Sequence, residues 1–452
     1  MSDSSDTIAA PSTPPGTSAI AVVRASGPDC ASLGEAIFGT PLPARVATRH
    51  DYRDRDGNVL DDVLVTFFAG PASYTGEDTL EISTHGNPLI SQLVLDDLFK
   101  RGCRPAEAGE FTRRAFLNGN LDLSQAEAVM DLIHARSERA VSAANRQLRG
   151  DLGRHLEQLT NDLLNALARI EAYIDFPEED LPPEDRTIVA QVLDNVLRGT
   201  SRLLATQRYG DLLRDGIKTV ILGEPNAGKS SLLNALLGRE RALVSDQPGT
   251  TRDYLEEPVI LGPHCLQLID TAGINPHPGA LEELGIHKTF ERISEADLVL
   301  LVLDCTHAAP PLPAEIQARL NPASTLVILN KQDLLAGKPA AAEPPTGIGR
   351  VSVSALNQTG LQELQQRIIE IADQFNPDQH GDTIAINARH ADALRRAETC
   401  LQSARSNLSA NGPTELLASD LRGVMDAFGE IAGRIDNESV LDRLFSTFCI
   451  GK

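Results

Sequence analysis

A glycine-rich stretch from Gly223 to Ser230 has residue types and a spacing suited to binding a phosphate chain. It reads G-E-P-N-A-G-K-S, the pattern G-x-x-x-x-G-K-[ST], and it follows the apolar run 219–222. Glycines let backbone N–H groups surround phosphate oxygens, and the helix that begins at Lys229 adds positive potential. Lys229 can reach the β and γ phosphates, and the Ser230 hydroxyl can bind Mg²⁺. The predicted contacts are Asn226, Ala227, Gly228, Lys229, Ser230 and Ser231.

A polar loop at residues 245–253 has the composition of a segment that senses the γ phosphate. A threonine in such a loop can bind Mg²⁺ only while the γ phosphate is present, and Thr251 is the predicted ligand. The loop residues predicted to contact nucleotide are Ser245, Asp246, Gln247, Pro248, Gly249, Thr250 and Thr251.

The strand predicted at residues 265–269 ends in a second phosphate motif, Asp270, Thr271, Ala272 and Gly273. A carboxylate at the end of a strand supports Mg²⁺ directly or through a water molecule, and we assign this role to Asp270. The Gly273 N–H can meet the γ phosphate. All four residues are therefore predicted nucleotide contacts.

Two later segments are typical of a guanine-binding pocket, one after the strand 326–329 and one at residues 351–356. The Asp333 carboxylate can accept the guanine N1 and N2 hydrogens, which selects against adenine because a buried unpaired carboxylate is costly. The Ala355 N–H can contact the guanine oxygen. The predicted base contacts are Asn330, Lys331, Asp333, Ser354 and Ala355. Five motifs in this order predict a GTP-binding domain.

Composition limits what else the chain can be. Its 452 residues are enough for about three domains. A formal net charge of -22 argues against one broad nucleic-acid-binding face, so any RNA contact needs a local basic patch. The six cysteines contain no C-x-x-C pair, which suits reduced thiols in the cytosol. The longest apolar runs have the length of strands, and the N-terminus lacks a signal peptide. We therefore expect a cytoplasmic protein without a membrane span.

The pattern changes along the chain suggest a multidomain α/β and α+β architecture. The β-branched runs 20–24, 62–68 and 79–83 predict strands, and helical periodicity dominates after residue 118. The simplest arrangement is a helical domain in two segments with the GTP-binding domain inserted between them. The predicted ranges are 1–118 for an α+β domain, 119–215 and 375–452 for the helical domain, and 216–374 for the nucleotide domain.

Four arginines form a basic stripe on an otherwise acidic chain. Arg136, Arg139, Arg146 and Arg149 fall within a limited arc of a helical wheel. The stripe is either a solvated helix face or a contact with an RNA backbone or a partner domain.

From residue 187 to about 213 the pattern predicts one further helix.

Beyond the GTP motifs, several segments carry a family resemblance. They are residues 13–16 (TPPG), 74–78 (YTGED), 110–118 (EFTRRAFLN), 121–127 (LDLSQAE) and 448–452 (FCIGK). With them the chain resembles the translation-factor-class GTPases of the TrmE-Era-EngA type and, within these, the MnmE (TrmE) family of tRNA modification GTPases. The resemblance extends over nearly all 452 residues. It implies a Ras-like α/β sheet for the nucleotide domain.

The resemblance also implies how GTP is hydrolysed. Ile274 stands where Ras-like enzymes have a glutamine that orients water. The family uses a bound K⁺ in the role of an arginine finger, and its implied ligands are Asn226, Ser245, Gln247 and Thr250. A glutamate downstream positions water, and Glu282 matches it by spacing, with Glu283 beside it as an alternative.

For the rest of the chain, the resemblance implies a tetrahydrofolate-binding module at the N-terminus that also mediates homodimerisation. Its implied contacts with a 5-formyl- or methylene-tetrahydrofolate are Arg24, Glu81, Asn120 and Lys452. Asn120 departs from the family, which has a lysine there. Cys449 is either structural packing or a thiol that serves the modification chemistry, and we carry it as a candidate catalytic residue. The apolar pattern Leu441, Leu444, Phe445 and Phe448 predicts that the C-terminal tail is docked.

The function implied by the resemblance is a K⁺-activated GTPase that also needs Mg²⁺. With the flavin-dependent partner MnmG (GidA), it would build a 5-carboxymethylaminomethyl or aminomethyl group on the wobble uridine (U34) of certain tRNAs. One alternative is a ribosome-assembly GTPase that acts as a binding switch, although such proteins usually carry a basic appendage. A second alternative is a folate-binding regulatory protein without an RNA task.

Overall fold

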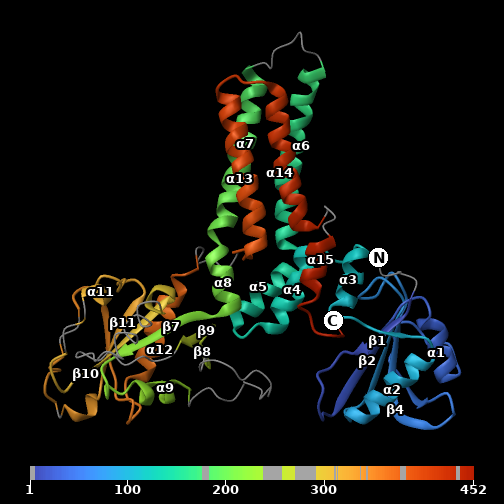
Figure 1. Cartoon of the computed structure of the whole chain (residues 1–452), viewed down its shortest axis with the longest axis horizontal. Helices are drawn as coiled ribbons and strands as arrows, with labels where there is room; N and C mark the ends of the chain where they lie inside the picture. Colours follow the sequence, from blue (N-terminus) through green and yellow to red (C-terminus); the bar gives the residue numbers. More distant parts are fainter. Residues whose placement is uncertain are drawn as a thin grey trace, which may run out of the picture. The chain divides into compact units, whose positions relative to one another are not determined.

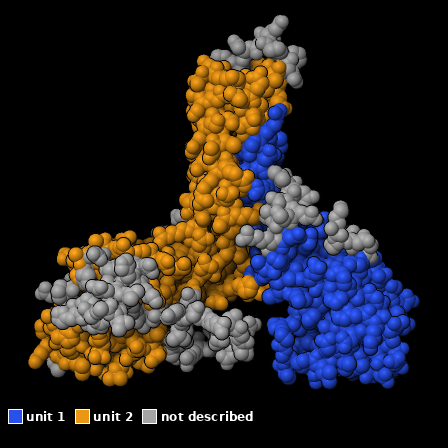
Figure 2. Space-filling model, viewed as in Figure 1, with its two compact units in different colours: residues 1–130, 147–164, 422–452 blue, residues 131–146, 165–421 orange. Residues whose placement is uncertain are grey.

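A computed structural model describes the chain over residues 6–175, 183–237, 257–269, 292–309, 312, 314–335, 337–342, 345–376, 383–433 and 438–451. The chain divides into two compact units, coloured separately in Figure 2. The first comprises residues 1–130, 147–164 and 422–452, and the second comprises residues 131–146 and 165–421.

The first unit is built on a mixed sheet in the strand order β3-β4-β5-β2-β1-β6. Its strands are β1 (Ile8–Pro11), β2 (Ile20–Ser26), β3 (Thr48–Arg53), β4 (Val59–Phe68), β5 (Thr79–His85) and β6 (Arg104–Pro105). Neighbouring strands are antiparallel except for β1 and β6, which are parallel. The three strands predicted from β-branched runs are β2, β4 and β5, each somewhat longer than predicted.

Alternate side chains of this sheet point to a buried face and to an opposite face. Val23 and Ala25 of β2 belong to a core that also contains side chains of α1 (Cys30–Phe38) and α2 (Pro88–Lys100), the helices beside the sheet in Figure 1. Burial of such side chains contributes about 1.5–3 kcal/mol each for the larger ones. Because side chains alternate along a strand, Arg24 between them lies on the opposite face.

The C-terminal tail belongs to the same unit. Helix α15 (Glu438–Phe445) packs against α3 (Glu110–Leu117), and Leu441, Phe445 and Phe448 share a buried cluster with Leu123. Gly109 donates its backbone N–H to the Cys449 carbonyl at 3.4 Å. The docked tail predicted from the apolar pattern is therefore confirmed.

The second unit is built on a sheet in the order β12-β11-β10-β7-β9-β8, parallel except for the edge strand β8. Its strands are β7 (Ile217–Gly223), β8 (Glu257–Leu261), β9 (His264–Ile269), β10 (Leu298–Asp304), β11 (Thr325–Asn330) and β12 (Gly349–Ser352). Helices α9 (Lys229–Leu237) and α12 (Leu361–Asp373) contribute to the core on one face, and α11 (Ala314–Gln317) contributes on the other. A parallel sheet covered on both faces explains its nearly continuous apolar strands.

Helices from both sides of the nucleotide domain meet in this unit. Helix α7 (Pro183–Ala205) packs along α13 (Ala388–Ser409), as Figure 1 shows, and Arg405 forms an ion pair with Asp194 at 2.9 Å. Four helices continue from one unit into the other: α4 (Leu123–His134), α5 (Glu138–Leu148), α6 (Asp151–Asp175) and α14 (Thr414–Ala432).

The single helix predicted from residue 187 to about 213 is wrong. The structure has α7 followed by a separate α8 (Gln207–Asp215), with the break at Thr206. The Thr206 hydroxyl donates to the carbonyls of Leu203 at 2.7 Å and Ile384 at 2.8 Å. A buried threonine side chain that competes for helix carbonyls favours such a break, and the periodic pattern alone does not reveal it.

The fold class predicted from the sequence is confirmed, whereas the four predicted domain ranges stay a prediction. Within the described part of the chain, no helix is both long enough and apolar enough to cross a lipid bilayer.

Candidate nucleotide-binding site

The described parts of the predicted phosphate and base motifs, which follow β7, β11 and β12, lie at one edge of the second sheet. In the parallel register Val302 pairs with Gly223, Asp304 pairs with Asn330, and Leu329 pairs with Ser352. The carboxyl ends of β7, β10, β11 and β12 therefore point the same way. In open α/β sheets this edge is where ligands bind.

The loop after β7 is held in a shape that non-glycine residues rarely adopt. Gly223 and Gly228 have φ angles of 155° and 92°, and Asn226 has 66°. A Cβ on Gly223 would lie 2.3 Å from the Val302 carbonyl oxygen, and one on Gly228 would lie 2.2 Å from the Asn330 side-chain nitrogen. Side chains at these two positions would clash, so the loop needs glycine there.

Lys229, at the start of α9, places a positive charge inside this loop. Its Nζ donates to the carbonyl oxygens of Gly223 at 2.9 Å and Glu224 at 2.7 Å. Burial lowers the pKa of the ammonium group, so a phosphate in the loop would relieve an unfavourable desolvation. Ser230 and Ser231 follow in the first turn of α9 and are exposed. This donor set fits a Mg²⁺-bound triphosphate, in which Ser230 would hold the metal.

Asn330 connects the phosphate loop to the predicted base loop. Its side-chain nitrogen donates to the Ala227 carbonyl at 2.9 Å, and its side-chain oxygen accepts the Ala355 N–H at 3.0 Å. The residue is 2 % exposed. The amide thus fixes the spacing between the two loops.

Asp333 and Ser354 are brought together as a guanine pocket requires. The Ser354 hydroxyl donates to an Asp333 carboxylate oxygen at 2.5 Å and accepts the Asn357 N–H at 3.1 Å. Asp333 is exposed, and its second carboxylate oxygen is the one expected to face a base. A carboxylate held this way presents an acceptor in a fixed direction.

Asp304 is a residue of this edge that the sequence reasoning missed. It ends β10 and forms an ion pair with Lys331 at 2.6 Å, while Lys331 itself has a φ of 66°. Burial raises the pKa of Asp304, but hydrogen bonds from Lys331 and Thr306 outweigh it and bring the pKa to about 2. The permanent charge holds the Lys331 side chain in place. In the sequence, the feature that could have indicated Asp304 is its position as an acidic residue at the end of the apolar run 298–303.

Several predicted site residues lie outside the described part of the chain. They are Ser245, Asp246, Gln247, Pro248, Gly249, Thr250, Thr251, Asp270, Thr271, Ala272, Gly273, Glu282 and Lys452. Their roles stay predictions.

Of the residues predicted to bind folate, the described ones are Arg24, Glu81 and Asn120, and all three belong to the first unit. Arg24 of β2 pairs across the sheet with Glu81 of β5 in an ion pair of 2.7 Å. The rings of Tyr74 and Phe111 each lie 5.6 Å from the Arg24 guanidinium, a stacking that the sequence reasoning did not foresee. Asn120 donates to the Tyr74 carbonyl at 3.2 Å and so fixes the loop that carries this ring.

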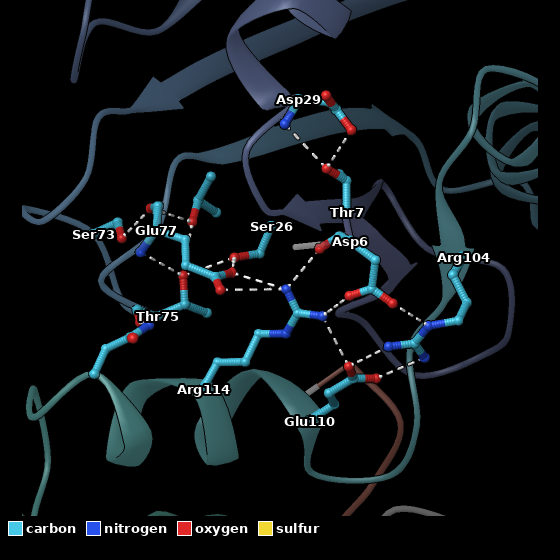
Figure 3. A network of polar contacts seen from close by, with 12 residues as sticks. Asp6, Thr7, Ser26, Asp29, Ser73, Thr75, Glu77, Arg104, Glu110 and Arg114 are labelled. Atoms are coloured by element: carbon cyan, nitrogen blue, oxygen red, sulfur yellow. Dashed lines mark hydrogen bonds and ion pairs between the residues drawn. The ribbon is translucent and has the colours of Figure 1, made fainter. Parts of the chain in front are cut away.

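The charged residues of the neighbouring motifs contact one another, as Figure 3 shows. Arg114 binds Glu77 at 3.1 Å, Glu110 at 3.0 Å and Asp6 at 2.6 Å, and Arg104 binds Glu110 at 2.6 Å. Burial raises the pKa of Glu110, but Arg104, the Glu107 N–H and Arg114 outweigh it, so that its pKa is lowered. These side chains hold the 74–78 loop and α3 together.

Cys449 is exposed on the docked tail. Its neighbour Ile450 forms a β-bridge with Ala108, and the Gly451 carbonyl accepts the Ser12 hydroxyl at 3.4 Å. The tail therefore runs beside β1, one strand from Arg24 in the order of the sheet. The structure places the thiol in the unit that holds the Arg24–Glu81 pair.

The parallel sheet, the lysine-bearing phosphate loop and the base loop together define a P-loop GTPase. Two family models match the chain: the GTP-binding protein TrmE N-terminus over residues 7–120 and the MnmE helical domain over residues 123–449.

Full-length relatives agree. The tRNA modification GTPase MnmE of Opitutus terrae is 58% identical over 448 residues, covering 99% of both chains. That of Akkermansia muciniphila is 44% identical and covers 100% of both chains, and that of Natranaerobius thermophilus is 40% identical and covers 99% of both. The chain belongs to the MnmE (TrmE) family of tRNA modification GTPases.

Proposed function

We propose that this tRNA modification GTPase is activated by K⁺ and acts on the wobble uridine of certain tRNAs together with the flavin-dependent partner MnmG. The observation that carries the GTPase part is the meeting of Lys229, Asn330 and Asp333 at one sheet edge, in a chain with full-length family members. The finer chemistry rests on the family resemblance.

Within the site, Lys229 would hold the β and γ phosphates, and Ser230 with Thr251 would hold Mg²⁺. Asp270 and Gly273 would meet the metal and the γ phosphate, and Glu282 would orient the attacking water. These residues bind and align, because phosphoryl transfer depends mainly on positioning and on the neutralisation of charge.

Asn226 is the described residue on which the K⁺ proposal depends. Its left-handed backbone and exposure leave the side-chain amide oxygen accessible beside the phosphate loop. With Ser245, Gln247 and Thr250 it would form an oxygen cage for a monovalent cation, which offsets negative charge that develops between the β and γ phosphates.

The first unit would supply the one-carbon unit as 5-formyl- or methylene-tetrahydrofolate. Arg24 and Lys452 suit carboxylates of the glutamate tail, and Glu81 suits the N–H edge of the pterin. Cys449 would serve the uridine chemistry. We further propose a homodimer in the cytoplasm, supported by Ile20 and Leu64, which are 57% and 49% exposed on the sheet face opposite α1 and α2.

Hydrolysis in matched salts tests the K⁺ proposal. The rate should be higher in KCl than in NaCl or tetramethylammonium chloride at equal ionic strength, and Asn226→Ala should weaken this difference. Equal rates in all three salts would remove K⁺ from the mechanism.

Nucleoside analysis of bulk tRNA from cells that lack the protein tests the function itself. Loss of the modified wobble uridines is expected. Intact uridines with defective ribosomal subunits would favour a ribosome-assembly switch, and intact uridines with altered folate pools would favour a folate-binding regulator. Complementation with Cys449→Ser should leave the uridines unmodified while GTP hydrolysis stays near that of the wild type.

A further inference from the structure

Two ion pairs hold one corner of the helical region, one to α8, which leads into the nucleotide domain, and one to α12 of that domain. The corner comprises residues 131–139, where α4 ends and α5 begins. Asp131 pairs with Arg214 at 3.0 Å, and Arg139 pairs with Asp373 at 2.6 Å. The corner supplies the negative residue, Asp131, to one pair and the positive residue, Arg139, to the other.

A third contact fixes the turn between β8 and β9. The Arg139 backbone N–H donates to the Pro263 carbonyl at 3.4 Å, and the His264 ring nitrogen lies 2.7 Å from the same Asp373 oxygen that binds Arg139. His264 is 6 % exposed. In the turn itself, a Cβ on Gly262 would come within 2.9 Å of the Ile369 side chain of α12. The turn is thus held between α5 and α12.

The strands that start at this corner are the ones that carry the phosphate motifs. Arg214 lies in the last turn of α8, which leads through Gly216 into β7, as Figure 1 shows, and β7 ends at the phosphate loop. His264 begins β9, whose last residue directly precedes Asp270 in the sequence. The two strands pair in parallel, with Ile217 opposite Leu266. A displacement at their common base would be carried along a strand of about 20 Å to the nucleotide edge.

Two arginines of the basic stripe, Arg136 and Arg139, lie against other parts of the protein. Arg139 forms an ion pair with Asp373. Burial raises the pKa of Cys265 on β9, and the charge of Arg136 partly offsets this, which places that arginine close to the same strand. An RNA backbone would have to compete with these contacts.

We propose that Arg139, Asp373, Asp131 and Arg214 are positioning residues for GTP hydrolysis, which fix the bases of β7 and β9 and thereby align the phosphate motifs at their far ends. The proposal rests on the proposed GTPase function. In this proposal, residues 131–139 influence the rate of GTP hydrolysis, because they fix the starting ends of β7 and β9, the two strands that lead to the phosphate motifs. Because thermodynamic coupling between two sites is reciprocal, a nucleotide that shifts these strands must also change the contacts of residues 131–139.

Variants of the full-length protein that each break one of the two ion pairs test this proposal. Arg139→Ala and Asp131→Arg should each lower kcat for GTP hydrolysis by about fivefold or more, with KM and the affinity for fluorescent GDP nearly unchanged. The double variant Asp131→Arg with Arg214→Asp restores an ion pair of inverted polarity and should recover most of the lost kcat.

Arg405→Ala is the matched control, since it breaks an ion pair of 2.9 Å with Asp194 in the same unit, on helices α13 and α7. Its kcat should equal that of the wild type. A kcat within twofold of wild type for both single variants would overturn the proposal, as would a double variant no better than Asp131→Arg. If Arg139→Ala proves unfolded by circular dichroism, the charge-swapped pair still decides. A wild-type protein without GTP hydrolysis would instead refute the proposed function.

Discussion

The nucleotide edge of the second unit and the motif loops of the first both carry many charged and polar motif residues, but these residues have different partners. In the first unit, Glu77 and Glu110 both bind Arg114. At the nucleotide edge, Asn226, Ser230 and Asp333 are exposed. The comparison indicates that a sequence motif rich in charged residues can form either a ligand site or a network of ion pairs within the protein. Whether the side chains are paired with one another or exposed distinguishes the two.

The difference has an energetic basis. A buried charge is costly unless it is paired, so the cluster around Arg114 has to be complete to be tolerated. A ligand site leaves some groups for the ligand and accepts a local cost such as the desolvated Lys229. Changes in the cluster around Arg114 should therefore act on stability, and changes at the nucleotide edge should act on activity.

The largest effect is expected for Lys229→Ala. Loss of the positive charge in the phosphate loop should lower kcat/KM for GTP by about 1,000-fold. Thermal stability should change little, because among the described residues the Lys229 ammonium group donates hydrogen bonds to carbonyl oxygens of its own loop. Steady-state kinetics and the melting temperature measure both. Lys338→Ala, an exposed lysine of the same unit, should match the wild type in both assays.

Arg114→Ala should lower the stability of the protein and leave its GTP hydrolysis nearly unchanged, which is the reverse of the result expected for Lys229→Ala. Removing the guanidinium leaves Glu77 and Glu110 without their shared partner, which should cost about 3–5 kcal/mol of stability. Hydrogen exchange of α3 would report the loss, while GTP hydrolysis should persist. Arg49→Ala, which breaks an exposed ion pair with Asp62 in the same unit, is the control and should leave the exchange of α3 unchanged. Unaltered exchange in Arg114→Ala would contradict the structural role.

Asp333→Asn should redirect base selection. The amide turns an acceptor into a donor toward guanine N1–H, so affinity for GTP should fall by about 100-fold while xanthosine triphosphate gains. Competition binding with both nucleotides gives the ratio. Glu363→Gln, an exposed carboxylate of α12, should keep the preference for guanine. A variant that still binds GTP tightly and gains nothing for the xanthine nucleotide would exclude Asp333 from the base pocket.

A smaller effect is expected for Glu110→Gln, and it depends on pH. The folded pKa of Glu110 lies below its ordinary value of 4.5, so its charge stabilises the fold above that pH and the contribution is lost as the pH falls through the folded pKa. Glu110→Gln should be less stable than wild type by about 1.5–3 kcal/mol near pH 7, and the gap should narrow below about pH 4.5. Melting temperatures across pH 3 to 7 test this, and a gap that stays constant would contradict it.

Local patterns predicted the nucleotide edge well. Gly223, Gly228 and Lys229 follow an apolar strand at a fixed spacing, and the strand-to-helix turn they require is a local structure. The docked tail was likewise readable, since Leu441, Phe445 and Phe448 recur at helical spacing. Family membership was predictable because the motif residues outside the nucleotide domain were specific.

Long-range partners were not predictable. Arg139 was readable as part of a basic stripe, but nothing near it in sequence points to Asp373, 234 positions away. Arg114 and Asp6 are separated by 108 positions, and the pairing of Asp304 with Lys331 needs two parallel strands in register. Contacts of this kind follow from topology, which residue spacing does not encode.

Wobble-uridine content in a strain that lacks this protein, measured by mass spectrometry after complementation, tests the central claim most directly. The wild-type chain should restore the modified nucleosides, and Lys229→Ala, expressed at the same level and folded, should not. Full modification with Lys229→Ala would separate GTP hydrolysis from tRNA modification and contradict the account.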